Sequence, residues 1–241
     1  MKRLFPEMND RPDKWMSAPI FGYWILGFAC IPVWLPMITA GLWGSAQVNS
    51  WVDVIYHTFN AVIVVWMLKS YAVDSFLEVQ LETGKFFKTV GIAALIMLTL
   101  ALELYFLFGP ALGEVFPIQV MSVATTPSVL ANQLPVLGIL CNVVFCPIAV
   151  VGLLYVPCFA PMCCRKTWLG YLVIPLMALA PTVFEILWRG VSDYVIPTYI
   201  LYLPIHFIAC WTYQKANTVW APLATLAIFN LGTSILALLP I

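Results

Sequence analysis

Charged residues are scarce in this chain of 241 amino acids. Asp, Glu, Lys and Arg make up only 9% of it, and the formal net charge is zero, whereas soluble domains carry about 25% charged residues. The lack of a basic excess or a basic cluster argues against nucleic acid as a partner. Hydrophobic residues reach 63%, above the roughly 45–50% of soluble domains. The composition therefore predicts a protein whose solvent is lipid.

Several catalytic and metal-binding signatures are also missing. The sequence has no His-Glu-x-x-His, no phosphate-binding glycine loop, no Gly-x-Ser-x-Gly elbow, and no Lys for a retinal Schiff base in its last apolar stretch. Seven cysteines are present, but no metal-ligand spacing of Cys and His accompanies them. We predict no metal site, and no cofactor is indicated. Cys163 and Cys164 adjoin Arg165-Lys166, which leaves acylation or metal binding there as lesser alternatives.

The apolar residues are gathered into long stretches. A helix needs about 20 such residues to cross the hydrocarbon core of a bilayer. The first stretch is too long for the h-region of a signal peptide, about 7–15 residues, so we expect it to be retained. The sequence predicts an all-α polytopic bundle, with a tail over residues 1–16 and one transmembrane domain over residues 17–241. The seven expected spans are Ser17–Trp43, Trp51–Leu68, Phe87–Gly109, Leu134–Cys164, Thr167–Trp188, Val191–Tyr213 and Thr218–Ile241. The fourth is long enough to tilt, or to end in an interfacial turn near Pro157 and Pro161.

The loops between these stretches differ in basic residues. With the N-terminus inside, ten of the eleven Lys and Arg residues fall on one side and only Arg189 on the other. Because cytoplasmic loops are enriched in Lys and Arg, we expect a cytoplasmic N-terminus and an outer C-terminus in a plasma membrane of bacterial type. Residues 70–86 mix apolar and acidic residues in a pattern typical of an amphipathic helix on the membrane interface.

A few polar residues fall inside the predicted spans, where an unpaired ionisable group is costly. Asp53, His57, Glu103 and Asn142 would lie in the outer half of the membrane and could line an outward polar cavity. Glu185 would also lie there, and could instead pair with Arg189 at the interface. The competing interpretation is that these groups form hydrogen bonds between helices.

The segment from Trp211, WTYQKANTVWAPLATLAIFNLG, resembles the end of the CAAX prenyl protease and bacteriocin-processing family of intramembrane endopeptidases. Family members have a short turn, Trp-Ala-Pro, and a helix with His-x-x-x-Asn. Here Thr218 to Pro222 match the turn and the helix entry, and Asn230 matches the Asn, but Leu226 replaces the His. The resemblance covers residues 134–241 and implies a related helical core.

Two alignments of the upstream family motifs remain open. In the first alignment, the segment from Glu185 through Arg189-Gly190 corresponds to the family's Glu-Glu-x-x-x-Arg-Gly motif. His206 then corresponds to the His of the family's Phe-x-x-x-His. The other, which the spacing favours, puts Trp188 in place of that His. In this second alignment, Val150 and Val151 replace the two glutamates of the motif. The family's chemistry, as the resemblance implies, needs a Glu to activate water and His and Asn groups to stabilise the oxyanion.

Three classes of function follow. The first is a divergent intramembrane endopeptidase that uses Glu185, His206 and Asn230. The second is a catalytically inactive relative that binds a peptide or a prenylated or otherwise lipidated protein, as an immunity-type protein does. The third is a small transporter or channel subunit built around His57 and Glu103. Membrane lipid is a partner in all three.

Overall fold

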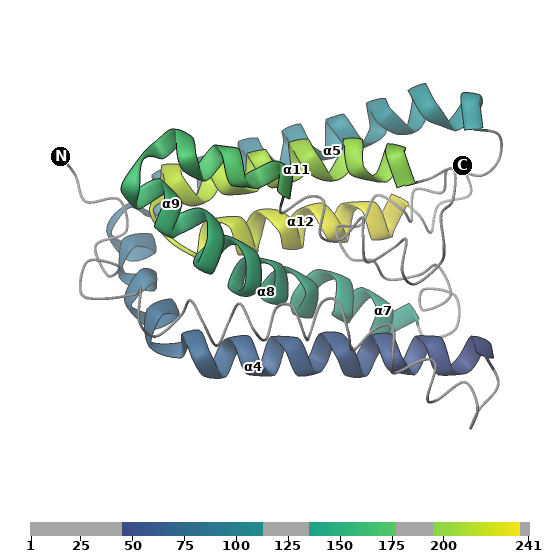
Figure 1. Ribbon diagram of the computed structural model, residues 1–241, viewed down its shortest axis with the longest axis horizontal. Coiled ribbons are helices and arrows are strands. Elements are labelled where there is room, and N and C mark those ends of the chain that lie inside the picture. The colour runs from purple at the N-terminus through teal and green to yellow at the C-terminus, as the bar shows by residue number, and fades with distance from the viewer. Residues whose placement is uncertain (1–44, 113–134, 177–194, 237–241) are drawn as a thin grey trace.

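The computed structural model describes residues 45–112, 135–176 and 195–236, and these residues are almost entirely helical (Figure 1). Within the described ranges there is no strand, which confirms the predicted all-α class. Two helical segments, Thr83–Glu103 and Val136–Arg165, are long and apolar enough to cross a membrane. The predicted span Ser17–Trp43 lies outside the described residues.

Helices occupy each of the other predicted apolar stretches. Their bounds differ from the predicted ones chiefly around residues 69–86, where helical structure extends beyond the apolar residues. The elements are α4 (Ser45–Leu81), α5 (Thr83–Leu112), α7 (Pro135–Leu140), η4 (Cys141–Phe145), α8 (Cys146–Val150), η5 (Val151–Phe159), α9 (Ala160–Arg165), α11 (Val195–Ala216) and α12 (Trp220–Leu236), with a further apolar helix at Thr167–Leu176.

The elements from α7 to α9 form one helical run that contains two π-helical stretches. The π-helix η4 ends just before Pro147, and Pro157 lies inside η5. Proline has no N–H to donate and clashes with the carbonyl one turn earlier, and a π-bulge shifts the hydrogen-bond register locally. The turn considered near Pro157 and Pro161 does not occur. The helix continues to Arg165 and stops at Lys166, which is extended with φ −152° and ψ 130°.

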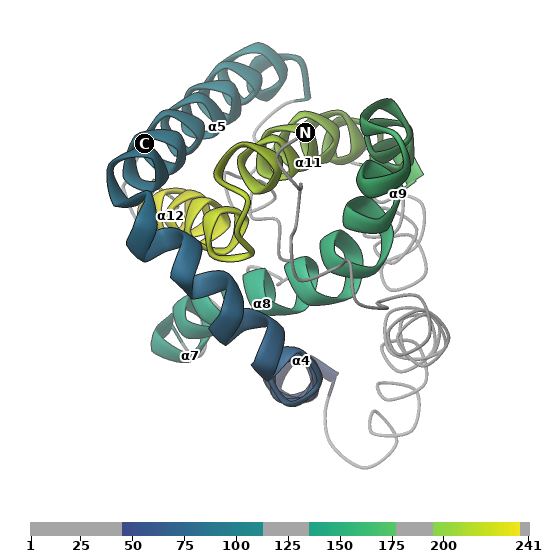
Figure 2. The ribbon, with the colours of Figure 1, turned by 90° about the vertical axis from the view of Figure 1, so that its left-hand side faces the viewer.

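The segment predicted to be an interfacial amphipathic helix, residues 70–86, is the end of α4 joined to the start of α5. Figure 2 shows the last part of α4 crossing the end of the bundle towards α5, while the rest of α4 is seen end-on. Tyr71 and Ser75, one turn apart, are buried against the bundle, whereas Val73 and Leu77 are exposed. The segment is therefore a continuation of a long helix, and its outer face carries apolar side chains together with the exposed Asp74.

The helix α12 lies at the centre of the described packing. It packs against α5 and α11 on one side and against η4 and α8 on the other (Figure 2). The largest wholly buried side chains include Tyr155, Phe159, Tyr213 and Phe229. Glycine allows close approach at Gly232, where an added Cβ would lie 2.6 Å from Leu98 Cδ2. Small residues at contacts of this kind are typical of helices that associate in membranes.

Candidate functional site

One predicted site residue, His206 of α11, is wholly buried beside Tyr155 of η5. The Tyr155 hydroxyl and His206 Nδ1 share a hydrogen bond of 2.6 Å in which either group can donate. Their rings meet edge to face, with centroids 5.7 Å apart and planes at 89°. This pair joins two helices in the interior, and sequence reasoning did not identify Tyr155 as a partner.

A second predicted residue, Asn230 of α12, is also wholly buried. Its Nδ2 donates a hydrogen bond of 2.7 Å to the backbone carbonyl of Asn142 in η4. The Ser234 hydroxyl donates to the Asn230 carbonyl at 2.7 Å. The structure thus brings together two residues that the sequence had assigned to different candidate sites, and uses the carboxamide of one to join α12 to a π-helix.

The family-motif positions of the second alignment are filled by buried apolar side chains. Val150 and Val151, which would replace the two acids, and Leu226, which replaces a His, belong to one hydrophobic cluster. Val150 ends α8, Val151 begins η5 and Leu226 lies in α12, and α8 packs against α12. Both Val150 and Leu226 are buried, at 5% and 0% exposure, so this part of the interior is apolar.

Of the remaining predicted site residues, Glu103 is the one whose side chain the structure describes. Glu103 is exposed on α5, and α12 lies between α5 and the π-helix that carries Asn142. Asp53 and His57 belong to α4, but their side chains lie outside what the structure describes, as does Glu185. Among the described residues, no group of three or more His, Cys, Asp or Glu side chains could hold a metal ion.

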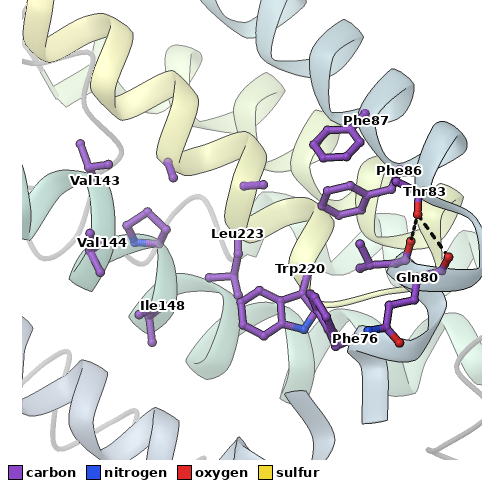
Figure 3. Close-up of a pocket in the computed structure, with 14 residues that line it drawn as sticks. Phe76, Gln80, Thr83, Phe86, Phe87, Val143, Val144, Ile148, Trp220 and Leu223 are labelled. Atoms are coloured by element: carbon purple, nitrogen blue, oxygen red, sulfur yellow. Dashed lines mark hydrogen bonds between the residues drawn. The ribbon is translucent and has the colours of Figure 1, made fainter. Parts of the chain in front are cut away.

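A groove lies where the end of α4, the start of α5, the η4–α8 segment and the start of α12 meet (Figure 3). Its volume is about 640 Å³, within the roughly 300–1,000 Å³ of small-molecule sites. Only Gln80 and Thr83 among its lining residues are polar. The apolar lining consists of Phe76, Val79, Phe86, Phe87, Val143, Val144, Pro147, Ile148, Trp220, Leu223, Ala224 and Ala227.

Trp220, a lining residue at the start of α12, joins that helix to α4. Its indole N–H donates to the Ala72 carbonyl at 2.8 Å, and its ring meets Phe76 edge to face at 5.7 Å between centroids. The Thr83 hydroxyl donates to the carbonyls of Val79 and Gln80, at 2.9 and 3.2 Å (Figure 3). The polar hydrogens of both side chains are therefore directed at helix backbone.

Hydroxyl groups fasten the end of α11 and the turn between α11 and α12 to α4. Thr218 donates to the Ser75 carbonyl at 2.8 Å, and the Val219 N–H donates to Ser75 Oγ at 2.9 Å. The hydroxyls of Tyr71 and Tyr213 are hydrogen-bonded nearby. Asn217 has φ 55°, a left-handed conformation that Asn tolerates better than most residues. The turn from Asn217 to Val219 is thus joined to α4 by several hydrogen bonds.

All basic side chains of the described ranges are exposed and belong to one end of the bundle. At this end α4 passes into α5, α9 ends and α11 passes into α12 (Figure 1). Acidic residues at the same end are Asp74, Glu78 and Glu82, and Glu82 forms an ion pair with Lys85. The basic residues are Lys69, Lys85, Lys88, Arg165, Lys166 and Lys215.

Comparisons of this chain with protein-family models, with curated proteins and with solved structures find no match.

The acids that the structure describes lie apart from the buried polar residues His206 and Asn230. A general base must come within hydrogen-bond reach of a water molecule beside the groups that stabilise the oxyanion. The acids whose side chains the structure describes are exposed or half-buried, and none lies in the interior with His206 or Asn230. Those two residues instead make hydrogen bonds between helices.

Proposed function

We propose that this chain is a polytopic membrane protein that acts by binding, as a catalytically silent relative of the CAAX-processing endopeptidases. The observation that carries the proposal is the apolar filling of the motif positions by Val150 and Leu226, both buried in one hydrophobic cluster. Valine cannot accept a proton, and leucine cannot donate a hydrogen bond to an oxyanion.

Asn230, the family-motif residue that the second alignment retains, supports the same interpretation. Asn230 directs its carboxamide N–H to the carbonyl of Asn142. Hydrogen bonds between membrane helices stabilise their association, so this contact gives Asn230 a structural role. A working oxyanion group would direct an N–H at substrate, whereas the hydrogen bond described for the Asn230 carboxamide goes to a helix backbone.

The outer surface supports the membrane placement. The exposed side chains of α4 and α5 include large apolar ones such as Trp66, which is 81% exposed, Phe87 and Leu95. Soluble monomers rarely expose contiguous apolar patches larger than a few hundred Å². The gathering of the described basic side chains at one end supports an orientation with that end, and the N-terminus, in the cytoplasm. Seven spans remain the proposed number.

The groove gives the proposed binding role a location. It lies at the basic end of the bundle and is almost wholly apolar, so it fits the hydrocarbon part of an amphiphile on the cytoplasmic side. The family resemblance implies a lipidated protein or peptide as one ligand of this kind.

A cleavage assay tests the proposed silence. The full chain would be reconstituted into liposomes and incubated with a farnesylated peptide that ends in a CAAX sequence, and the products would be followed by mass spectrometry. We expect no cleavage above that of empty liposomes. Cleavage by the wild-type chain that is lost in His206→Ala and Asn230→Ala, with both variants folded, would overturn the proposal. The variant Thr99→Ala, on the exposed surface of α5, is the control for preparation and reconstitution.

A further inference from the structure

We infer that the groove between α4, α5, the η4–α8 segment and α12 binds one acyl chain of an anionic phospholipid. The inference deepens the binding role proposed above and rests on it for the membrane orientation. It does not depend on the absence of catalysis.

The lining of the groove favours a hydrocarbon chain over a peptide. A bound peptide leaves backbone N–H and C=O groups that must find partners once buried. Of the donors among the lining side chains, the Trp220 indole N–H and the Thr83 hydroxyl already donate to carbonyls of α4, and the Gln80 carboxamide stands only at the polar end of the groove. An acyl chain makes no such demand and gains from contact with Phe76, Phe86 and Leu223.

The groove is also laid out for an amphiphile. Its polar residues, Gln80 and Thr83, flank the junction of α4 and α5 at the basic end. From Trp220 its wall follows α12 to Ala227, about 10 Å along the axis at the 1.5 Å rise of an α-helix. Over that length it meets Val143 and Val144 and loses all polar lining (Figure 3). A headgroup at one end and a chain directed into the membrane match this gradient.

The charge of this end selects the headgroup. The described residues there carry six basic and three acidic side chains, so the balance is 6 − 3 = +3. Lys88 lies in the first turns of α5 next to the groove residue Phe87, and Lys85, next to Phe86, is paired with Glu82. Clustered Lys and Arg at the cytoplasmic face of a membrane protein attract anionic lipid headgroups. A zwitterionic lipid with the same chains would lack this attraction.

Fluorescence quenching by brominated lipids tests the inference on the purified full chain in detergent. Trp220 lines the groove, but the chain has ten tryptophans, so the Trp220 signal is the difference between wild type and Trp220→Phe. Phosphatidylglycerol with brominated acyl chains would be titrated, and phosphatidylcholine with the same brominated chains would be the comparison. We expect saturable quenching of the Trp220 signal by phosphatidylglycerol, at lower concentrations than for phosphatidylcholine, and reversal by unbrominated phosphatidylglycerol.

Two neighbouring substitutions on α12 locate the site. Ala227→Phe fills the groove and should abolish the saturable quenching, whereas Ile228→Phe, one residue along at an exposed position, should leave it intact. If Ala227→Phe fails to fold, reversal by unbrominated lipid in the wild type decides. Equal quenching by the two lipids, or quenching that never saturates, would overturn the inference.

A farnesylated CAAX peptide added to the lipid-loaded chain separates this inference from the proposed function. Displacement of the brominated lipid by less peptide than unbrominated phosphatidylglycerol would assign the groove to a lipidated peptide. That result would overturn the lipid assignment and leave the binding role standing. Cleavage of the peptide, in contrast, would overturn catalytic silence without touching the lipid site.

Discussion

At the scale of single residues, hydroxyl and amide groups join the described helices, and the charged side chains that the structure describes are exposed or half-buried. Ser75, Thr218 and the tyrosine pair fasten α4 to the α11–α12 turn. In the interior, Tyr155 holds His206 and Asn230 holds a backbone carbonyl. Buried polar groups of this kind cost little when satisfied and much when one partner is removed. Their contribution should therefore appear in stability measurements.

The substitution Ser75→Ala should destabilise the chain. It removes the acceptor of the Val219 N–H and a partner of Thr218, and leaving a buried group unsatisfied costs about 1–3 kcal/mol. Thermal unfolding in detergent, followed by the loss of monodisperse protein, measures the effect. The matched control is Ser70→Ala, at an exposed position of the same helix. Equal melting temperatures for the two variants would contradict a role for the Ser75 contacts.

The substitution Tyr155→Phe tests the contact with His206. It keeps the ring in place but removes a wholly buried hydroxyl, so we expect a loss of about 1–3 kcal/mol in the free energy of unfolding. The control Tyr171→Phe removes a hydroxyl bonded to Gln214 at 2.5 Å in a partly buried setting, where water can replace the lost partner. Denaturant unfolding in micelles compares them, and a larger loss for Tyr171→Phe would argue against the buried pair.

None of these pairings could be predicted from the sequence. Helical spacing shows which residues share a face, and this correctly marked His206 and Asn230 as residues inside apolar helices. It does not show which helices are neighbours, so Tyr155 was overlooked and Asn142 was assigned to a different candidate site from Asn230. Partner choice depends on the packing of segments far apart in the chain, such as 155 with 206.

At the scale of elements, hydropathy predicted where the described helices lie because each must cover its backbone with apolar side chains. It predicted less well how they continue. The helix α4 runs past the apolar stretch to Leu81, since its last turns gain contacts with the α11–α12 turn. The π-helices η4 and η5 have no signature in composition, although the prolines near them mark where an ordinary helix would be strained.

We predict an effect of substitution at Gly152, where η5 lies in close contact with α4. A Cβ there would overlap Val64 of α4 and lie 3.1 Å from its Cβ, and a β-branched side chain has little rotamer freedom to move away. Gly152→Ala should therefore destabilise by about 1–3 kcal/mol through overpacking. Gly91→Ala in α5, where nothing lies within 4 Å, should be neutral or stabilise by up to about 1 kcal/mol. Parallel melting curves decide, and a stable Gly152→Ala would mean that η5 and α4 pack less tightly.

At the scale of the whole molecule, the proposed orientation rests on where the basic side chains lie relative to the apolar surface. The exposed apolar side chains of α4 and α5 form a surface suited to lipid, and the basic side chains of the described residues gather beyond one end of it. The polar lining residues of the groove, Gln80 and Thr83, lie at that same basic end. If the orientation were reversed, the groove would receive lipid from the outer leaflet.

Accessibility of single cysteines tests the orientation directly. Cys164 is exposed near the end of α9, at the basic end, whereas Val136 is 78% exposed near the start of the same helical run. In intact cells a membrane-impermeant maleimide should label Val136→Cys, placed in a Cys164→Ser background, and should leave Cys164 of the wild type unlabelled. Inside-out vesicles should reverse the pattern. Replacing Cys30 and Cys158 by Ser in both proteins removes a thiol outside the described residues and one that is only partly buried.

The buried cysteines provide a control that distinguishes a wrong orientation from a loss of the fold. The thiols of Cys141, Cys146, Cys163 and Cys210 are buried and should react only after denaturation, so they report that the fold is intact in each preparation. Labelling of Cys164 in intact cells would place the basic end outside, against the Lys and Arg bias. It would also move the lipid groove to the outer leaflet, where anionic phospholipid would no longer be the favoured ligand. Protection of Cys164 in cells together with labelling in inside-out vesicles would place the groove where its charge can act.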